Sequence, residues 1–461
     1  MNLLAHDPSR PNSAVRAFLE AVEHPRIEVS VDARDEMLRH LLQAHHGSID
    51  AGLVGYFRTG LMAARLLEDV GRWRFGSRAF RILEFASGHG RVTRFIRDLL
   101  PNAEIVAAEV DESAVAFQRS VMGVPCVETE SAPESVPPED FDVVFAASFF
   151  SHLPEERFDP WLRRLYSLVA PGGALVLSTH GEETLPRGRV MPARGLYFEM
   201  VSESDRFEPS EYGSTWVEES YVDRLLQRIS EGRARFRCFR RALWHSQDVY
   251  VIVPQEGPDF SSLRLTEHAQ GYLDACYLED PGTLLISGWA ALETRDGQPV
   301  EVEAWINGEV RGRVTPTLPR SDAEPLIGGA SRSAGFVLRV GSPQGYDSRD
   351  ILTLVLRSGS RVDVIHAGSI EGTGLYLKLV QRSQESENLR HERECARAER
   401  DGFSAALASE SQRVADLERA IHQTGWQKHV LEQQISDMKR SRFWKARDAW
   451  FRMRGRKTTE P

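Results

Sequence analysis

A short segment around Glu84 and Gly90 combines residue types that could hold a small ligand. In Phe80–Phe95, FRILEFASGHGRVTRF, an apolar run ends in an acid, and small residues then lead into a helix-like pattern. Small residues let a main chain approach a ligand closely, and the first turn of a helix presents free N–H groups. A pyrophosphate site would need a third glycine where Thr93 stands, and Glu84 would repel a diphosphate. The segment therefore favours a ligand with a positive charge, such as a sulfonium or an ammonium group.

A second acidic segment follows at the spacing of a ribose-binding carboxylate. Residues 103–108 are expected to form a strand, and Glu109 and Asp111 come directly after it. A carboxylate about 20 residues beyond such a loop can accept hydrogen bonds from both ribose hydroxyls. We expect Glu109 rather than Asp111 to do so. Adenosine joined to a cationic amino-acid tail is S-adenosylmethionine, so the two segments together predict this cofactor.

These motifs resemble those of class I S-adenosylmethionine-dependent methyltransferases. ILEFASGHGRVTRF resembles the glycine-loop motif, AAEVDESAVAF the ribose-binding motif, FDVVFAASFFSHLPEE the fourth-strand motif and LYSLVAPGGALVLSTHG the fifth-strand motif. Segments at 56–60, 178–181, 212–215 and 244–249 resemble a subgroup linked to bacterial surface-polysaccharide biosynthesis and glycosyltransferases. The resemblance covers about residues 50–254, and Ala86 departs from it where the family usually has its first glycine.

The resemblance implies a Rossmann-like α/β domain with a seven-stranded, mostly parallel sheet that binds S-adenosylmethionine. The cofactor-binding residues that it implies, together with the spacing above, are Glu84, Ala86, Ser87, Gly88, Gly90, Glu109, Asp111 and Ser148.

Three residues are candidates for catalysis. A sugar hydroxyl needs a base before it can accept a methyl group, whereas a phosphate does not. His180 is the first candidate, because it follows the expected fifth strand and carboxyl ends of strands line the ligand crevice of such sheets. His245 is the second, with Asp248 as a carboxylate that could orient it. His89 and His152 lie nearer the cofactor motifs and are expected to have structural roles.

Composition excludes several classes of protein. The chain has 461 residues, 41% of them hydrophobic, and a formal net charge of −10, which argues against nucleic-acid binding by the chain as a whole. Four widely separated cysteines predict neither a metal site nor a disulfide scaffold. The chain shows neither a secretory signal nor an apolar run of transmembrane length, so we expect a cytoplasmic protein.

Shifts in sequence pattern divide the chain into five parts. We expect an N-terminal helical region at 1–75, the methyltransferase domain at 76–256, a β-sandwich accessory domain at 263–380, a coiled coil at 381–440 and a basic amphipathic tail at 441–461. A linker is expected at 254–258. Within the β-sandwich, Asn307-Gly308 between alternating segments predicts a hairpin.

The last two parts carry the expected contacts with partners. Apolar residues recur with seven-residue spacing through Leu407, Val414, Ile421 and Ile435, which predicts a homo-oligomeric coiled coil, with a single solvated helix as the alternative. From residue 439 to 457 the chain has nine Lys or Arg and one acid, interleaved with aromatic residues. Such a segment suits the cytoplasmic face of an anionic inner membrane. A protein partner and, less favoured, a nucleic acid are the alternatives for this tail.

The sequence thus predicts an S-adenosylmethionine-dependent methyltransferase that O-methylates a sugar of a bacterial surface polysaccharide or of its precursor. The acceptor would be a glycan or a lipid-linked glycan, and glycosyltransferases are expected partners. The alternative is a non-catalytic scaffold that organises glycosyltransferases at the membrane. A nicotinamide-dependent oxidoreductase ranks third, because the third glycine is missing.

Overall fold

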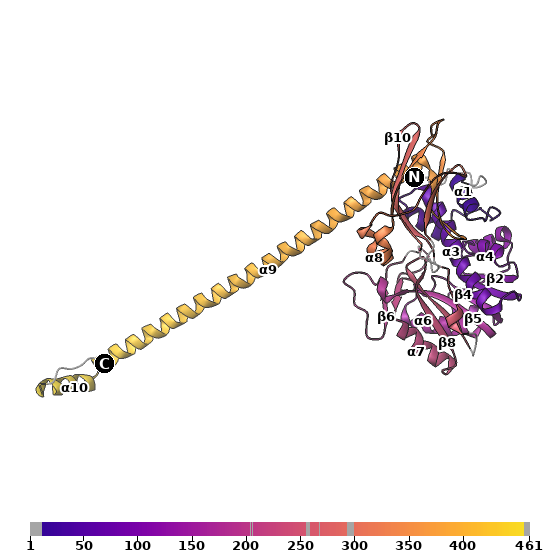
Figure 1. The fold of residues 1–461 in the computed structure, drawn as a ribbon. Helices are drawn as coiled ribbons and strands as arrows, with labels where there is room; N and C mark the ends of the chain where they lie inside the picture. Colours follow the sequence, from indigo (N-terminus) through magenta and orange to yellow (C-terminus); the bar gives the residue numbers. More distant parts are fainter. Residues whose placement is uncertain are drawn as a thin grey trace. The chain divides into compact units, whose positions relative to one another are not determined.

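The computed structural model describes residues 12–202, 204, 206–254, 259–266, 268–292 and 299–455, and it is drawn in Figure 1. The chain divides into two compact units, residues 1–380 and 381–461. The linker predicted at 254–258 lies outside the described residues from position 255 onward.

Three helices precede the first strand, and each begins at a residue whose side chain caps it. Asn12, Asp35 and Ser48 each accept hydrogen bonds from main-chain N–H groups of the first helical turn. The helices are α1 (Ser13–Ala21), α2 (Glu36–Ala44) and α3 (Ile49–Phe75). The long helix α3 buries much of its surface, including Tyr56 and Phe57, and so forms one wall of the main core.

The central sheet has the expected Rossmann-like order. Five parallel strands run β3-β2-β1-β4-β5, β9 lies antiparallel against β5, and β8 pairs antiparallel with β9. The seven strands are β1 (Phe80–Phe85), β2 (Ala103–Glu109), β3 (Cys126–Glu128), β4 (Phe141–Ala146), β5 (Val169–Gly181), β8 (Arg235–Leu243) and β9 (Gln247–Val253). Strands β1 and β4 bury nearly every residue, as expected where helices cover both faces of a parallel sheet. Those helices are α4 (Thr93–Leu99), α5 (Glu112–Phe117), α6 (Glu155–Ser167) and α7 (Glu219–Ser230).

The prediction of seven strands is wrong in number, because the sheet has nine among the described residues. Strand β4 ends at Ala146, opposite Leu177, so the last residues of the longer strand β5 have a free edge. Strand β7 (Ser214–Val217) pairs there with His180 and Gly181, and β6 (Leu196–Glu199) pairs with β7. The segment that joins β6 to β7 supplies part of the pocket described below.

The second half of the first unit contains two antiparallel sheets that pack face to face. One has the order β10-β11-β14 and the other β13-β12-β15-β16, and both contribute to one core, for example through Ile286 and Leu354. Their strands are β10 (Gln270–Asp280), β11 (Thr283–Ala291), β12 (Glu301–Ile306), β13 (Glu309–Val314), β14 (Gly335–Gly341), β15 (Ile351–Ser358) and β16 (Arg361–Ser369). The predicted hairpin is confirmed, since Asn307 and Gly308 both have positive φ between β12 and β13.

The two sheets also join the N-terminal helices. Helix α1 packs on β15 and β16, so that Phe18 and Val364 share one core cluster. The Arg58 guanidinium of α3 donates a 2.5 Å hydrogen bond to the carbonyl oxygen of Ala269. Asp50, also on α3, accepts a 3.0 Å hydrogen bond from the main-chain N–H of Ser369.

The chain ends in two helices, α9 (Ile370–Arg440) and α10 (Arg442–Met453). Helix α9 therefore begins eleven residues before the predicted coiled coil, and its first turns bury Ile370, Thr373 and Val380. Beyond that point the apolar residues of the predicted seam are exposed, Leu407 at 71% and Ile421 at 70%. No helix within the described ranges is both long enough and apolar enough to cross a membrane.

Candidate active site

A pocket opens at the carboxyl ends of β1, β2 and β4, where open α/β sheets usually bind ligands. Three stretches form its floor, 85–89 after β1, 108–111 after β2 and 147–149 after β4. Its other walls come from helix α2, from helix α6 with the residues just before it, and from the segment between β6 and β7. The residues that those walls contribute include Met37, His40, His152, Arg157, Trp161, Arg206, Phe207 and Tyr212.

The loop after β1 turns through three residues in the left-handed region. Ala86, Gly88 and Gly90 have φ of 53°, 55° and 74°. A Cβ built on Gly88 would meet nothing within 4 Å, whereas one on Gly90 would lie 2.6 Å from Met122 Cγ. Gly88 therefore borders open space in the pocket, and Gly90 is required by packing. Ala86 lines the pocket in a conformation that is unfavourable for a residue with a Cβ.

Glu109 joins the loop after β1 to the loop after β2. Its Oε2 accepts a 2.7 Å hydrogen bond from the main-chain N–H of Gly88, and its Oε1 accepts bonds from the N–H groups of Val110 (2.8 Å) and Asp111 (3.0 Å). The side chain is buried but lines the pocket. Burial raises the pKa of this carboxyl group, although the three N–H bonds act in the opposite direction.

Glu84 lies beneath the loop and is absent from the pocket lining. The Thr93 hydroxyl donates a 2.6 Å hydrogen bond to its carboxylate, and Gln118 Nε2 donates both to Thr93 Oγ1 and to the carbonyl oxygen of Gly88. Burial raises the pKa of Glu84 to about 7. This chain of contacts fixes the position of Gly88, so Glu84 supports the loop from below.

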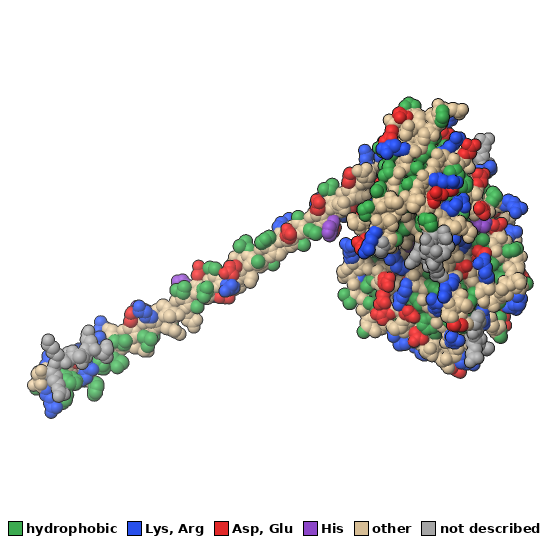
Figure 2. Space-filling model, viewed as in Figure 1, with side chains coloured by type: hydrophobic (Ala, Val, Ile, Leu, Met, Phe, Trp, Pro, Cys, Tyr) green, Lys and Arg blue, Asp and Glu red, His purple; other side chains and the backbone are tan. Residues whose placement is uncertain are grey.

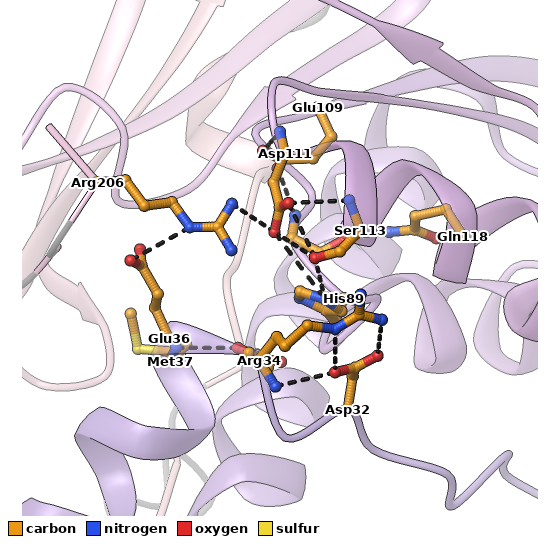
Figure 3. A network of polar contacts seen from close by, with 12 residues as sticks. Asp32, Arg34, Glu36, Met37, His89, Glu109, Asp111, Ser113, Gln118 and Arg206 are labelled. Carbon is orange, nitrogen blue, oxygen red and sulfur yellow. Dashed lines mark hydrogen bonds and ion pairs between the residues drawn. The ribbon is translucent and has the colours of Figure 1, made fainter.

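Asp111 belongs to a polar network that reaches helix α2 (Figure 3). Its Oδ1 accepts a hydrogen bond from the main-chain N–H of Ser113 and so caps α5. Its Oδ2 lies 2.6 Å from Nη1 of Arg206, and Nε of the same arginine lies 3.3 Å from Oε1 of Glu36. Burial opposes ionisation of Asp111, but the hydrogen bonds from Arg206 and Ser113 outweigh it and lower the pKa. His89 contacts the same network, with Nε2 3.3 Å from Ser113 Oγ. Arg206 therefore connects one wall of the pocket to the loop after β2.

His152 faces the pocket with a fixed orientation, although the sequence had predicted only a structural role for it. Its Nδ1 lies 2.8 Å from the carbonyl oxygen of Gly213, and its ring stacks on Tyr212 at a centroid distance of 4.6 Å. A carbonyl oxygen only accepts, so Nδ1 carries the hydrogen, and in the neutral ring Nε2 is the proton acceptor. The signal in the sequence was its place four residues after Ser148, at the end of the expected fourth strand.

Ser148 lines the pocket beside His152. It has a φ of 57°, and its Oγ lies 3.4 Å from His152 Nε2. Gln247 Nε2 donates a 2.9 Å hydrogen bond to the same oxygen, and the Ser148 N–H donates to Ser178 Oγ at 2.8 Å. Strands β5 and β9 thus hold the loop after β4 in place.

The three residues predicted to be catalytic lie outside the pocket lining. His180 lies next to the pocket, because its ring meets the ring of the pocket residue His152 edge-on at a centroid distance of 6.4 Å. The His180 ring also stacks on Trp216. Asp248 is buried and accepts hydrogen bonds from the Arg240 guanidinium (2.9 Å) and from the main-chain N–H of Arg241 (2.8 Å).

His245 borders a different hollow, between strand β8 and the start of β10. Burial lowers its pKa to about 4, and the charge of Arg58 acts in the same direction. Six of the predicted site residues therefore line one pocket, namely Ala86, Ser87, Gly88, Glu109, Asp111 and Ser148. The other five do not line it, namely Glu84, Gly90, His180, His245 and Asp248.

The residues of the pocket fit an adenosine cofactor with a charged amino-acid tail. Ser87 Oγ is buried, lines the pocket and has no hydrogen-bond partner among the residues that the structure describes, which leaves it available to a ligand. Gly88 presents open space beside it, and Glu109 is the acidic side chain at the carboxyl end of β2. Within the described residues, no group of three or more His, Cys, Asp and Glu is arranged to hold a metal ion.

Comparisons with known proteins agree with this geometry. A family model described as "Methyltransferase domain" matches residues 83–175. The chain is 32% identical over 125 residues to a malonyl-[acyl-carrier protein] O-methyltransferase of Bacillus cytotoxicus, covering 27% of this chain and 43% of that protein. It is 28% identical over 151 residues to the protein of the same name from Methylococcus capsulatus. This match covers 31% of this chain and 54% of that protein. The chain thus spans about half the length of the curated relatives that it matches.

Solved structures that match parts of the chain include "DhpI-SAH complex structure" and "Crystal Structure of the Glycopeptide N-methyltransferase MtfA". The first is 19% identical and covers 48% of this chain and 96% of that chain, with a TM-score of 0.31. The second is 17% identical and covers 41% and 90%, with a TM-score of 0.32. The family match confirms the predicted methyltransferase domain over residues 83–175, a range that includes the ends of β1, β2 and β4 at the pocket floor.

Proposed function

We propose that this chain transfers the methyl group of S-adenosylmethionine to an oxygen atom of an acceptor that enters the pocket beside His152. The observation that carries the proposal is that one pocket contains both the Ala86–Gly88 loop with Glu109 and a histidine whose Nε2 is a proton acceptor. The bound cofactor supplies a methyl group activated by a sulfonium centre.

The two halves of the pocket have different tasks. Glu109 accepts from the ribose hydroxyls, while Ser87 and the open side of Gly88 receive the amino-acid tail. Positioning of this kind contributes much of the rate of a displacement between two bound molecules. The acceptor lies on the side of the pocket formed by helix α2, His152 and Tyr212, where Arg206 contacts both Glu36 and Asp111.

His152 acts as the general base for a hydroxyl acceptor. The bond from Nδ1 to the Gly213 carbonyl and the stacking on Tyr212 hold the ring, so that Nε2 can take the proton as the oxygen–methyl bond forms. A base of this kind typically contributes about 10²- to 10⁴-fold to the rate.

The proposed acceptor is a sugar hydroxyl of a bacterial surface polysaccharide or of its lipid-linked precursor. One observation supports a sugar, the aromatic rings of Phe207 and Tyr212 in the pocket wall, on which a sugar ring can stack. The second candidate is a carboxylate, favoured by the names of the curated relatives, which are O-methyltransferases of a malonyl group. A carboxylate is already ionised near neutral pH and would not need the base. A scaffold without catalysis, which organises glycosyltransferases, is the remaining alternative.

One experiment separates these possibilities. The full chain is incubated with S-adenosylmethionine labelled in its methyl group and with bacterial membrane extract, and labelled products are treated with mild alkali. Label in an alkali-stable ether on a glycan supports the sugar, and label released as methanol from an ester supports the carboxylate. If neither the extract nor added acyl-carrier substrates accept label, although the cofactor binds, the proposal of methyl transfer is wrong and the scaffold remains.

A further inference from the structure

Helix α10 has an exposed face that methyl transfer does not use. Phe443, Trp450 and Met453 are 78%, 47% and 82% exposed. They are spaced by seven and three residues, so they lie along one side of the helix. Apolar side chains of this size, gathered on one short helix, mark a surface that contacts something less polar than water.

Cations surround this face. Between residues 439 and 454 there are seven Lys or Arg, namely Lys439, Arg440, Arg442, Lys445, Arg447, Arg452 and Arg454, against the single acid Asp448. Two of the cations stack on tryptophan, Arg447 at 3.7 Å from the centre of the Trp444 ring and Arg454 at 4.5 Å from that of Trp450. Figure 2 shows apolar and basic side chains next to one another at this end of the chain. The positive charge contrasts with the net charge of −10 for the whole chain.

The chain separates this helix from α9. Helix α9 ends at Arg440, and Ser441 leaves the helical conformation with a φ of −63° and a ψ of 152°. The Ser441 hydroxyl accepts a hydrogen bond from the N–H of Trp444 and caps a new helix. The amphipathic segment therefore forms its own short helix with its own axis.

We infer that α10 is a docking surface for an anionic lipid membrane, on which Phe443, Trp450 and Met453 enter the boundary between headgroups and acyl chains. Aromatic rings suit that boundary because one side of the ring is apolar and the other tolerates water. The surrounding cations attract the anionic headgroups, and each cation raises the affinity of the helix for the membrane by a factor of about five. This role concerns where the enzyme acts and goes beyond the chemistry proposed for the pocket.

The test uses the full chain and vesicles of two compositions. Purified protein is sedimented with vesicles of phosphatidylglycerol and phosphatidylcholine in equal parts, and with pure phosphatidylcholine, at increasing concentrations of KCl. We expect sedimentation with the anionic vesicles alone, and its loss as salt rises. Cofactor binding by the same samples shows that the pocket is intact, so a failure of docking is distinguishable from a failure of the proposed function.

Two sets of variants separate the charge from the apolar face. The charge variant Lys445→Gln/Arg452→Gln/Arg454→Gln should bind anionic vesicles about 10²-fold more weakly. Its matched control, Arg382→Gln/Arg390→Gln/Arg393→Gln, removes the same charge from exposed positions on α9 and should stay within about twofold of the parent. The face variant Phe443→Ser/Trp450→Ser/Met453→Ser keeps every charge and should lose at least about tenfold.

Three outcomes would overturn the inference. Equal binding to neutral and anionic vesicles, or none to either, would exclude a charge-directed lipid surface and favour a protein partner. An equal loss of vesicle binding in the control and in the charge variant would show that binding depends only on the net charge of the chain. Unchanged binding by the face variant would show that the apolar side chains do not enter the membrane.

Discussion

The main-chain N–H of Gly88 donates a 2.7 Å hydrogen bond to the carboxylate of Glu109, across the tops of two neighbouring parallel strands. The same carboxylate also receives the N–H groups of Val110 and Asp111. One acidic side chain therefore shapes both loops that face the adenosine end of the pocket.

Replacing Glu109 by alanine should weaken S-adenosylmethionine binding by about 1.5–3 kcal/mol, because a charged acceptor for the ribose is lost. Calorimetric titration measures this directly. Glu104→Ala is the matched control, since Glu104 is an exposed carboxylate on the same strand β2 at its opposite end. Equal affinities for both variants and the parent would show that Glu109 does not hold the cofactor.

His152→Asn should lower turnover by about 10²- to 10⁴-fold while leaving cofactor affinity nearly unchanged. The asparagine amide can still donate to the Gly213 carbonyl, but it cannot accept a proton at neutral pH. Steady-state rates across pH 5 to 9 give the measurement, and the variant should lose the rise of rate with pH that a histidine base produces.

His180→Ala is the comparison, because His180 was the base predicted from the sequence and its ring is the neighbour of His152. We expect a smaller effect than that of His152→Asn. The opposite ranking would return the role to His180. If neither variant slows turnover, an acceptor that is already ionised, a carboxylate or a phosphate, becomes the better assignment.

The cofactor-free chain should lose stability as pH rises from about 4.5 to about 7, in part through Glu84. In the unfolded chain this carboxyl releases its proton near the ordinary glutamate pKa of 4.5, whereas burial in the folded chain raises the pKa to about 7. The unfolded state therefore binds fewer protons within that window, and the free energy of unfolding falls by about 3 kcal/mol across it.

Glu84→Gln removes this contribution, because the amide oxygen can still accept from the Thr93 hydroxyl without becoming charged. Urea unfolding at several pH values should show a difference between variant and parent that grows through that window and is constant above it. Parallel curves for the two proteins would contradict the burial of an ionisable Glu84, and Glu104→Gln controls for the loss of an exposed carboxylate.

The full chain should self-associate through α9. Leu407, Val414, Leu417 and Ile421 are 50–71% exposed in the single chain, and a second helix is needed to cover them. Leu417→Glu/Ile421→Glu should shift the molar mass measured by light scattering at micromolar concentration from oligomer to monomer. The control Ala415→Glu/His422→Glu adds the same charges at the residues that directly follow two seam positions. It should leave the molar mass of the oligomer unchanged. A parent chain that is monomeric would leave the single solvated helix as the correct description.

The parts of the site that the sequence predicted are contiguous along the chain. The strand, small-residue loop and helix around Gly88 follow one another directly, so residue type and spacing were sufficient to place them. Ala86, where the sequence departs from the family's usual glycine, has a φ of 53°, in the left-handed region that favours glycine.

The parts that could not be predicted depend on contacts between distant segments. His152 is oriented by Gly213, 61 residues away, and Glu36 meets Arg206, 170 residues away. Both contacts require the β6–β7 addition to the sheet, which exists because β5 is longer than β4. Strand length of that kind is set by pairing partners rather than by local pattern, and the seven-strand expectation missed it for this reason.

The central claim, that the pocket beside His152 binds S-adenosylmethionine for methyl transfer, is tested most directly by calorimetric titration of the full chain with that cofactor. The account predicts saturable binding at one site per chain, weakened in Glu109→Ala and retained in His152→Asn. Absence of binding by the parent chain, or undiminished binding by Glu109→Ala, would contradict it.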